Sequence, residues 1–114
     1  MVATKSEMTH KQKRLFDTLS RSGELIFAAG KPGISANIVG VFSIREYGDE
    51  QRLDMGDGTN HVHVDWERVK RVEAGQFHGE GMLEFFDGDE HLFRLYRPDG
   101  DFPEEVIKLV GNLL

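Results

Sequence analysis

Two histidines separated by one residue are the feature of this 114-residue sequence best suited to ligand chemistry. The segment Asn60–His61–Val62–His63–Val64 alternates polar and apolar residues, so a strand here would place His61 and His63 on one face, roughly 6.5–7 Å apart along the chain. Two imidazoles at this spacing can bind one transition metal, or one can bind a haem iron while the other orients it. A surface strand that carries two histidines without a ligand is the alternative interpretation.

The other candidate groups have simpler interpretations beside the functional one. His78 lies in Phe77–His78–Gly79–Glu80–Gly81, where the glycines either let a flat ligand approach the backbone or form a turn. His91 opens a strand after an acidic turn and is expected at the surface, and His10 carries no functional signal. No pair of carboxylates has both a desolvating context and a nucleophile beside it, and the sequence has none of the phosphate-loop, G-x-S-x-G, H-E-x-x-H or dinucleotide-binding motifs. We therefore expect a binding protein, with an enzyme as the less favoured hypothesis.

The composition excludes several classes of site and partner. The sequence contains no cysteine, which excludes disulfides, thiolate metal sites, cysteine nucleophiles and haem attachment through C-x-x-C-H. Its net charge of −6 repels nucleic acid and anionic membranes, and no apolar run approaches the ~18 residues of a membrane span. The first 14 residues do not have the pattern of a secretory signal. We expect a cytoplasmic protein that binds neither nucleic acid nor a membrane.

Two helical segments enclose the region that carries these residues. Thr9 and Gln12 have the spacing of a capping box, and apolar residues follow at helical spacing, which predicts a helix over residues 10–20. A second helix is expected from a cap at Asp101 or Phe102, with Pro103 in its first turn. Its predicted buried stripe consists of Val106, Ile107, Val110, Leu113 and Leu114.

Between the helices the hydrophobic period is two, which is typical of strands. Turns are expected at Tyr47–Gly48–Asp49–Glu50, Gly56–Asp57–Gly58 and Asp87–Gly88–Asp89–Glu90. Because parallel crossovers need longer connections, six to eight short strands joined by brief turns predict an antiparallel sheet. The expected class is α+β, with a large antiparallel β-sheet flanked by N- and C-terminal helices in one domain over residues 1–114, of which residues 1–8 are frayed.

The second half of the chain resembles a known family. The resemblance rests on residues 61–72, on Gln76–Phe77–His78–Gly79, and most closely on residues 83–96, a hairpin of the form apolar–Phe–Phe–turn–apolar–Phe–basic–apolar–aromatic. These segments resemble the cytoplasmic haem-utilisation carriers of the HemS and ChuX/HutX type, as a single-unit relative. The resemblance implies a large curved antiparallel sheet with flanking helices, haem as cofactor, and a homodimer that pairs through its sheets.

The resemblance also implies a set of ligand-binding residues. His63 occupies the place of the family's strand histidine and is the first choice as axial ligand of the haem iron, with His61 and His78 as second choices. The side chains implied to meet the propionates are Arg45, Arg71, Arg94 and Arg97. Haem requires a flat apolar slot, a neutral imidazole nitrogen directed at the iron, and cations at the rim.

Three hypotheses remain open at this point. The first is a protein that binds haem or another apolar planar ligand and hands it on. The second is a binding or assembly module of the same fold without haem, and without catalytic activity, that uses the sheet for a protein partner or a different ligand. The third is an enzyme that degrades haem or uses a bound metal.

Overall fold

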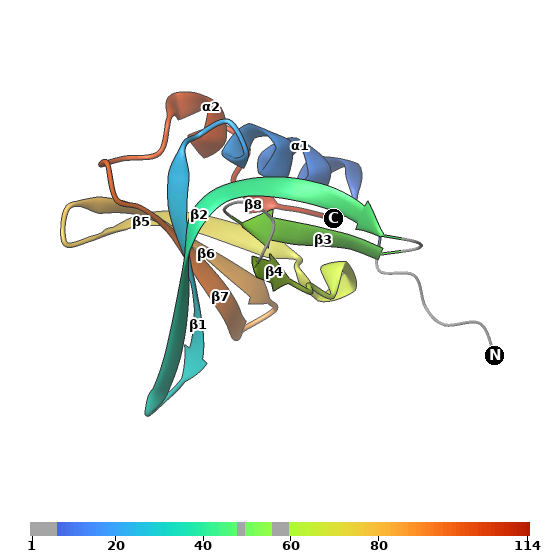
Figure 1. Cartoon of the computed structure of the whole chain (residues 1–114), viewed down its shortest axis with the longest axis horizontal. Coiled ribbons are helices and arrows are strands. Elements are labelled where there is room, and N and C mark those ends of the chain that lie inside the picture. The colour runs from blue at the N-terminus through green and yellow to red at the C-terminus, as the bar shows by residue number, and fades with distance from the viewer. Residues whose placement is uncertain (1–6, 48–49, 56–59) are drawn as a thin grey trace.

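The computed structural model describes residues 7–47, 50–55 and 60–114 of the chain. A helix precedes seven strands, and a short helix and an eighth strand end the described chain (Figure 1). The elements are α1 (His10–Leu19), β1 (Glu24–Lys31), β2 (Ile34–Tyr47), β3 (Glu50–Met55), β4 (Asn60–Val62), the 3-10 helix η1 (Trp66–Arg68), β5 (Arg71–Phe77), β6 (Glu80–Asp87), β7 (Glu90–Arg97), α2 (Glu104–Ile107) and β8 (Gly111–Asn112).

The strands of the described residues form one antiparallel sheet in the order β4-β3-β2-β1-β7-β6-β5-β8. Its curvature comes from β2, whose residues 34–41 pair with β1 and whose residues 42–47 pair with β3. Helices α1 and α2 lie beside each other on one side of the sheet (Figure 1). The predicted α+β class, a curved antiparallel sheet with flanking helices, is confirmed.

One face of the sheet carries the core. Leu15, Phe16 and Leu19 of α1 are fully buried against it, as the helical spacing predicts. The ring of Phe16 lies 5.1 Å from Trp66 in an edge-on arrangement and 5.5 Å from Phe85. Phe16 thereby joins the first helix to both η1 and the middle of the sheet.

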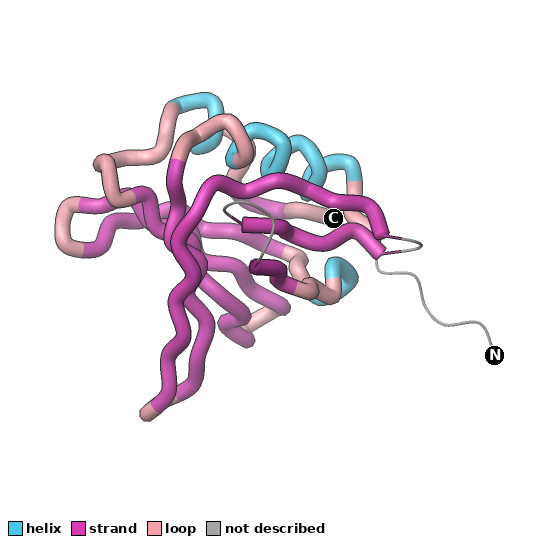
Figure 2. The backbone as a smooth tube through the Cα atoms, in the orientation of Figure 1, coloured by secondary structure: helices cyan, strands magenta, loops and turns pink. Residues whose placement is uncertain are grey.

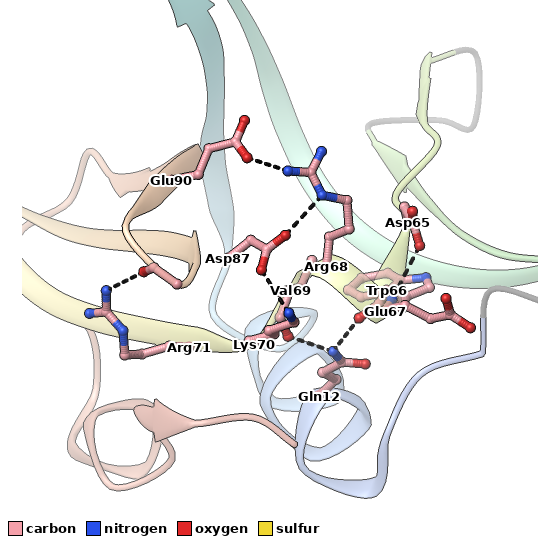
Figure 3. Close-up of polar contacts among 11 residues, drawn as sticks. Gln12, Asp65, Trp66, Glu67, Arg68, Val69, Lys70, Arg71, Asp87 and Glu90 are labelled. Atoms are coloured by element: carbon pink, nitrogen blue, oxygen red, sulfur yellow. Dashed lines mark hydrogen bonds and ion pairs between the residues drawn. The ribbon is translucent and has the colours of Figure 1, made fainter.

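A buried carboxamide fixes the start of α1 and the position of η1 (Figure 3). The Thr9 hydroxyl accepts from the Gln12 backbone N–H and Gln12 Oε1 accepts from the Thr9 N–H, which is the predicted capping box. Gln12 Nε2 donates to the carbonyls of Trp66, at 2.8 Å, and Val69, at 2.7 Å. One side chain with no exposed surface therefore holds three backbone groups from two distant segments.

The predicted first helix over residues 10–20 and the predicted turn at residues 87–90 agree with the structure within one residue. Residues 66–68 form the 3-10 helix η1, whose first turn is capped by the side chain of Asp65. The turn predicted over residues 47–50 falls partly, and that over residues 56–58 wholly, outside the described residues. Of the residues expected to be frayed, 1–6 also lie outside them.

The predicted second helix is wrong in length and cap. Helix α2 covers only Glu104–Ile107, its N-cap position is Pro103, and no side chain caps it. The chain then turns at Gly111, with φ of 118°, and adds β8 to the edge of β5, while the Leu113 N–H donates to the Lys70 carbonyl. The backbone N–H and C=O groups at the edge of β5 form hydrogen bonds with β8. A longer helix α2 would have left these edge groups without such partners. Ile107 and Leu114 of the predicted stripe are consequently exposed, whereas Val106 and Leu113 are buried.

We expect replacement of Gln12 by Ala to lower the free energy of unfolding by about 2–4 kcal/mol, because two buried carbonyls lose their donor. Urea denaturation followed by circular dichroism measures the change. Gln76→Ala, at an exposed position of β5, is the matched control and should change stability little. Equal stabilities for the two variants would contradict the structural role assigned to Gln12.

Candidate functional site

His63 lies at the rim of a cavity on the core side of the sheet. Strand β4 ends at Val62, one residue before His63 and earlier than the sequence predicts, and His63 is exposed. The cavity has a volume of about 250 Å³. Its lining consists of Phe27, Ala29, Val62, His63, Val64, Asp65, Arg68, Val69, Leu92 and Phe93.

Two aromatic rings form the apolar part of this cavity. Phe27 of β1 and Phe93 of β7 stack at 4.9 Å, and Phe93 stacks in turn on Phe85 at 4.5 Å. Phe27 and Phe93 are 8% and 5% exposed, so they belong to the core and also line the cavity. An imidazole beside an aromatic wall is an arrangement that suits a flat ligand.

The position of His63 depends on the elements that flank it. Before it, β4 pairs with β3 through three residue pairs. After it, Gln12 holds the carbonyl of Trp66, and Trp66 Nε1 donates to the carbonyl of Gln51 at 2.7 Å. The short segment that carries His63 is thus held at both ends by the sheet and by α1.

His61 lies close to His63 and has its own polar partner. The two ring centroids are 6.3 Å apart, which brings together the pair that the sequence singles out. Nδ1 of His61 is 3.6 Å from Oδ1 of Asp54, a buried carboxylate that also pairs with Arg52 at 3.0 Å and Arg45 at 3.5 Å. Within the described part of the chain, no group of three or more His, Asp or Glu side chains is placed to hold a metal ion.

The structure places His78 in a tight turn. His78 and Gly79, with φ of 52° and 80°, connect β5 to β6, so the glycine serves the hairpin. Gly81 serves packing, because a Cβ there would lie 2.8 Å from the backbone nitrogen of Phe102. The His78 ring packs on Phe77 at 4.2 Å, outside the lining of the His63 cavity.

None of the four predicted arginines lines the His63 cavity. Arg45 is joined to His61 through Asp54. Arg71 covers the ring of Phe86 at 4.3 Å, and Arg97 Nη1 donates to the Asp101 carbonyl at 2.8 Å. Arg94 lies on the opposite face of the sheet.

Arg68, which the sequence reasoning missed, is a cation that lines the cavity. It pairs with Asp87 at 3.0 Å and with Glu90, and Lys70 reaches the other oxygen of Asp87 at 2.9 Å (Figure 3). The hydrogen bonds from Lys70 and then Arg68 hold the pKa of Asp87 below its ordinary value of 3.8, and the Asp87 hydrogen bond raises the pKa of Arg68. The sequence shows only that a basic residue follows Asp65–Trp66–Glu67. This pattern does not indicate that the side chain of Arg68 lines a cavity.

A larger cleft lies on the opposite face of the sheet. Its volume is about 760 Å³, and its apolar wall includes Ile26, Phe77 and Tyr96. His91 and Arg94 also line it, so His91 is exposed as predicted but stands beside a cleft. Figure 2 shows that the adjoining β1–β2 hairpin projects beyond the rest of the sheet.

One carboxylate organises the polar side of this cleft. Glu84 Oε2 pairs with His91 Nε2 at 3.2 Å and with Arg94 Nε at 3.1 Å. Partial burial, the largest influence, lowers the pKa of Arg94, but the hydrogen bonds and charges of Tyr96 and Glu84 outweigh it and raise that pKa overall. Arg94 is therefore a cation already neutralised by Glu84.

Solved structures share this fold. A crystal structure of ChuX superposes with a TM-score of 0.60 at 13% identity, covering 90% of this chain and 69% of that one. A second structure, described as the heme binding protein ChuX, gives 0.60 at 12% identity and covers 90% of this chain and 70% of that one. A protein from Agrobacterium tumefaciens gives 0.58 at 12% identity, covering 90% of this chain and 64% of that one.

These similarities define the fold as ChuX-like, which confirms the resemblance at the level of architecture. The chain spans about two thirds of the length of these proteins. No family model matches the sequence. No curated protein matches it either. No helix among the described residues is long and apolar enough to cross a bilayer.

The ion pairs of Asp87 predict a pH dependence of stability. Because the folded pKa of Asp87 is lowered, its contribution is complete at and above about pH 5 and is lost as the pH falls through the folded pKa, below the ordinary 3.8. We expect the stability difference between wild type and Asp87→Asn to shrink when denaturation is measured at pH 3 instead of pH 6. Asp89→Asn, in the same hairpin turn, is the control. A difference that stays constant between the two pH values would refute this assignment.

Proposed function

We propose that the protein binds haem at the His63 cavity and carries it in the cytoplasm. The observation that carries the proposal is the exposed imidazole of His63 at the rim of a cavity walled by Phe27 and Phe93. The ChuX-like fold supports it, because one of the similar structures is described as a heme binding protein. Haem supplies an iron that accepts an imidazole nitrogen and a flat apolar surface that packs on aromatic side chains.

The cavity fits part of such a ligand. Enclosed ligand pockets usually measure roughly 300–1,000 Å³, so a cavity of about 250 Å³ leaves much of a haem exposed. Partial exposure suits a protein that receives and hands on its ligand more than one that retains it. His63 is the first candidate for the ligand, and His61 and His78 are the second choices.

The arginines near the His63 cavity are better candidates than the other arginines for binding the propionates of haem. Arg68 lines the cavity and Arg45 lies near His61, so these two are the first candidates. Both already pair with carboxylates, which means that a propionate would join or replace an existing ion pair. Arg71, Arg94 and Arg97 have less support, because they contact residues away from this cavity.

Titration of the purified apo-protein with haemin tests the proposal. We expect a saturable Soret band with one haem per chain, and a dissociation constant raised at least about tenfold by His63→Ala, which removes the iron ligand. His91→Ala, whose imidazole pairs with Glu84 on the opposite face, should leave the constant within about twofold. A titration that does not saturate, or equal losses in both variants, would exclude His63 as the ligand.

The exposed face of the sheet supports the proposal of a homodimer. Val39 and Val41 of β2 and Phe77 of β5 are 51%, 46% and 49% exposed. Residues of this type on the surface of a sheet are stabilised when a second sheet covers them. We propose that two copies of the chain pair through this face.

Light scattering of the purified protein should therefore give twice the mass of one chain. A charge placed in the paired face, Val39→Glu, should shift the protein to the mass of a single chain. Ile107→Glu, an exposed apolar position on α2, should leave the dimer intact. A single-chain mass for the wild type would reject sheet-to-sheet pairing.

The larger cleft favours a second candidate function, a binding or assembly module without haem. With about 760 Å³ and a mixed aromatic and charged lining, this cleft lies in the usual size range of ligand sites. Under this hypothesis haemin does not bind specifically, and the opposite face of the sheet takes a different apolar ligand or a protein partner. The haemin titration above separates the two functions.

A further inference from the structure

We propose that His61 and His63 together form a binding site for a divalent transition-metal ion, with Cu²⁺ bound most tightly. The two imidazoles lie next to each other at the end of β4, and the buried carboxylate of Asp54 lies beside the ring of His61. The inference does not rest on the proposed haem function, since haem needs only His63 whereas this site needs both side chains.

The carboxylate of Asp54 faces one nitrogen of His61. The two residues are directly opposite each other in the β3–β4 pairing, and Nδ1 of His61 lies 3.6 Å from Oδ1 of Asp54. Because the Nδ1 side of the ring faces the carboxylate, Nε2 on the far side of the ring is directed away from it. A carboxylate behind a metal-binding imidazole favours the tautomer with the proton on the nitrogen that faces it, which leaves the other nitrogen able to bind a metal.

Asp54 itself is held firmly enough to do this. Its side chain is 4% exposed, and Arg52 Nε donates to Oδ1 at 3.0 Å while Arg45 Nη1 donates to Oδ2 at 3.5 Å. The two guanidinium groups compensate the buried negative charge. Asp54 is therefore a positioning residue for His61 and not itself a ligand.

The separation of the rings is compatible with one shared ion. A metal bound at about 2.1 Å from an imidazole nitrogen lies about 3.2 Å from the ring centroid, so two rings with a nitrogen directed at the ion can share it when their centroids are up to about 6.4 Å apart. The observed separation is 6.3 Å, with the ring planes at 80° to each other. A small rotation of one side chain shortens the distance between the ring centroids, so that the angle nitrogen–metal–nitrogen can be less than 180°. His61 can rotate in this way because 38% of its side chain is exposed.

The donor set selects the class of metal. Two imidazole nitrogens suit Cu²⁺, Ni²⁺ and Zn²⁺, among which the intrinsic order of affinity favours Cu²⁺. Among the described residues, no third protein ligand is placed to join them. Such a site is open, exchangeable and weaker than a structural metal centre.

The test is a titration of the haem-free full chain with CuSO₄, followed by calorimetry and electron paramagnetic resonance. We expect one Cu²⁺ per chain in the tightest class of sites, with hyperfine splitting from two imidazole nitrogens. His61→Ala and His63→Ala should each weaken this binding at least about tenfold, and His91→Ala should not. Unchanged binding in the His61→Ala/His63→Ala double variant, with the fold intact by circular dichroism, would overturn the proposal.

The positioning role of Asp54 has a separate readout. In the metal-free protein, ¹⁵N chemical shifts should show His61 mainly as the tautomer protonated at Nδ1, and Asp54→Asn should mix the two tautomers and weaken Cu²⁺ binding by about tenfold or more. Unaltered shifts in a folded Asp54→Asn variant would refute this role.

Failure of this inference and failure of haem binding give different results. If copper binds as described and haemin does not, only the haem proposal is lost. If haemin binds through His63 but no two-nitrogen copper signal appears, only the metal site is lost.

Discussion

The carboxamide of Gln12 is the interaction on which the arrangement of the candidate site depends. It connects the first turn of α1, through Thr9, to both ends of η1, through the carbonyls of Trp66 and Val69. The amide satisfies groups that burial would otherwise leave without partners. Because η1 starts three residues after His63, the same hydrogen bonds determine where the chain returns to the sheet. They thereby also fix the position of the residues around η1 that line the cavity. A site at a sheet edge thus derives its geometry from a helix far away in the sequence.

The local patterns in the sequence predicted those parts of the fold whose hydrogen bonds are themselves local. The capping box at Thr9 and Gln12 located α1, and the turn residues 87–90 located the β6–β7 hairpin, in which Asp87 pairs with Glu90. By contrast, β8 forms because the edge of β5 is free, and nothing in Gly111–Asn112 indicates that edge. Of the apolar residues that a single longer helix would have used, α2 contains only Val106 and Ile107, and β8 contains none.

The same distinction applies to the candidate site. Strict alternation in residues 60–64 was enough to predict that His61 and His63 lie together. Asp54 could not be predicted beside them, because its place depends on the register between β3 and β4. The four arginines chosen by family resemblance separate onto different surfaces, since a change of one residue in a strand moves a side chain to the other face. Arg68 lines the cavity only because η1 turns the backbone there.

The hydrogen bond between Thr9 and Leu113 has a consequence for the order of folding. The Thr9 hydroxyl donates to the Leu113 carbonyl at 2.5 Å, across 104 positions of the chain. Helix α1 precedes every strand against which it packs, so it cannot reach its final environment until those strands and Leu113 have been synthesised. Closing such a long loop is entropically costly, and chains dominated by distant contacts fold slowly. Until the sheet has formed, the apolar side of α1 has nothing to pack against. We therefore expect α1 to dock onto the sheet late in folding.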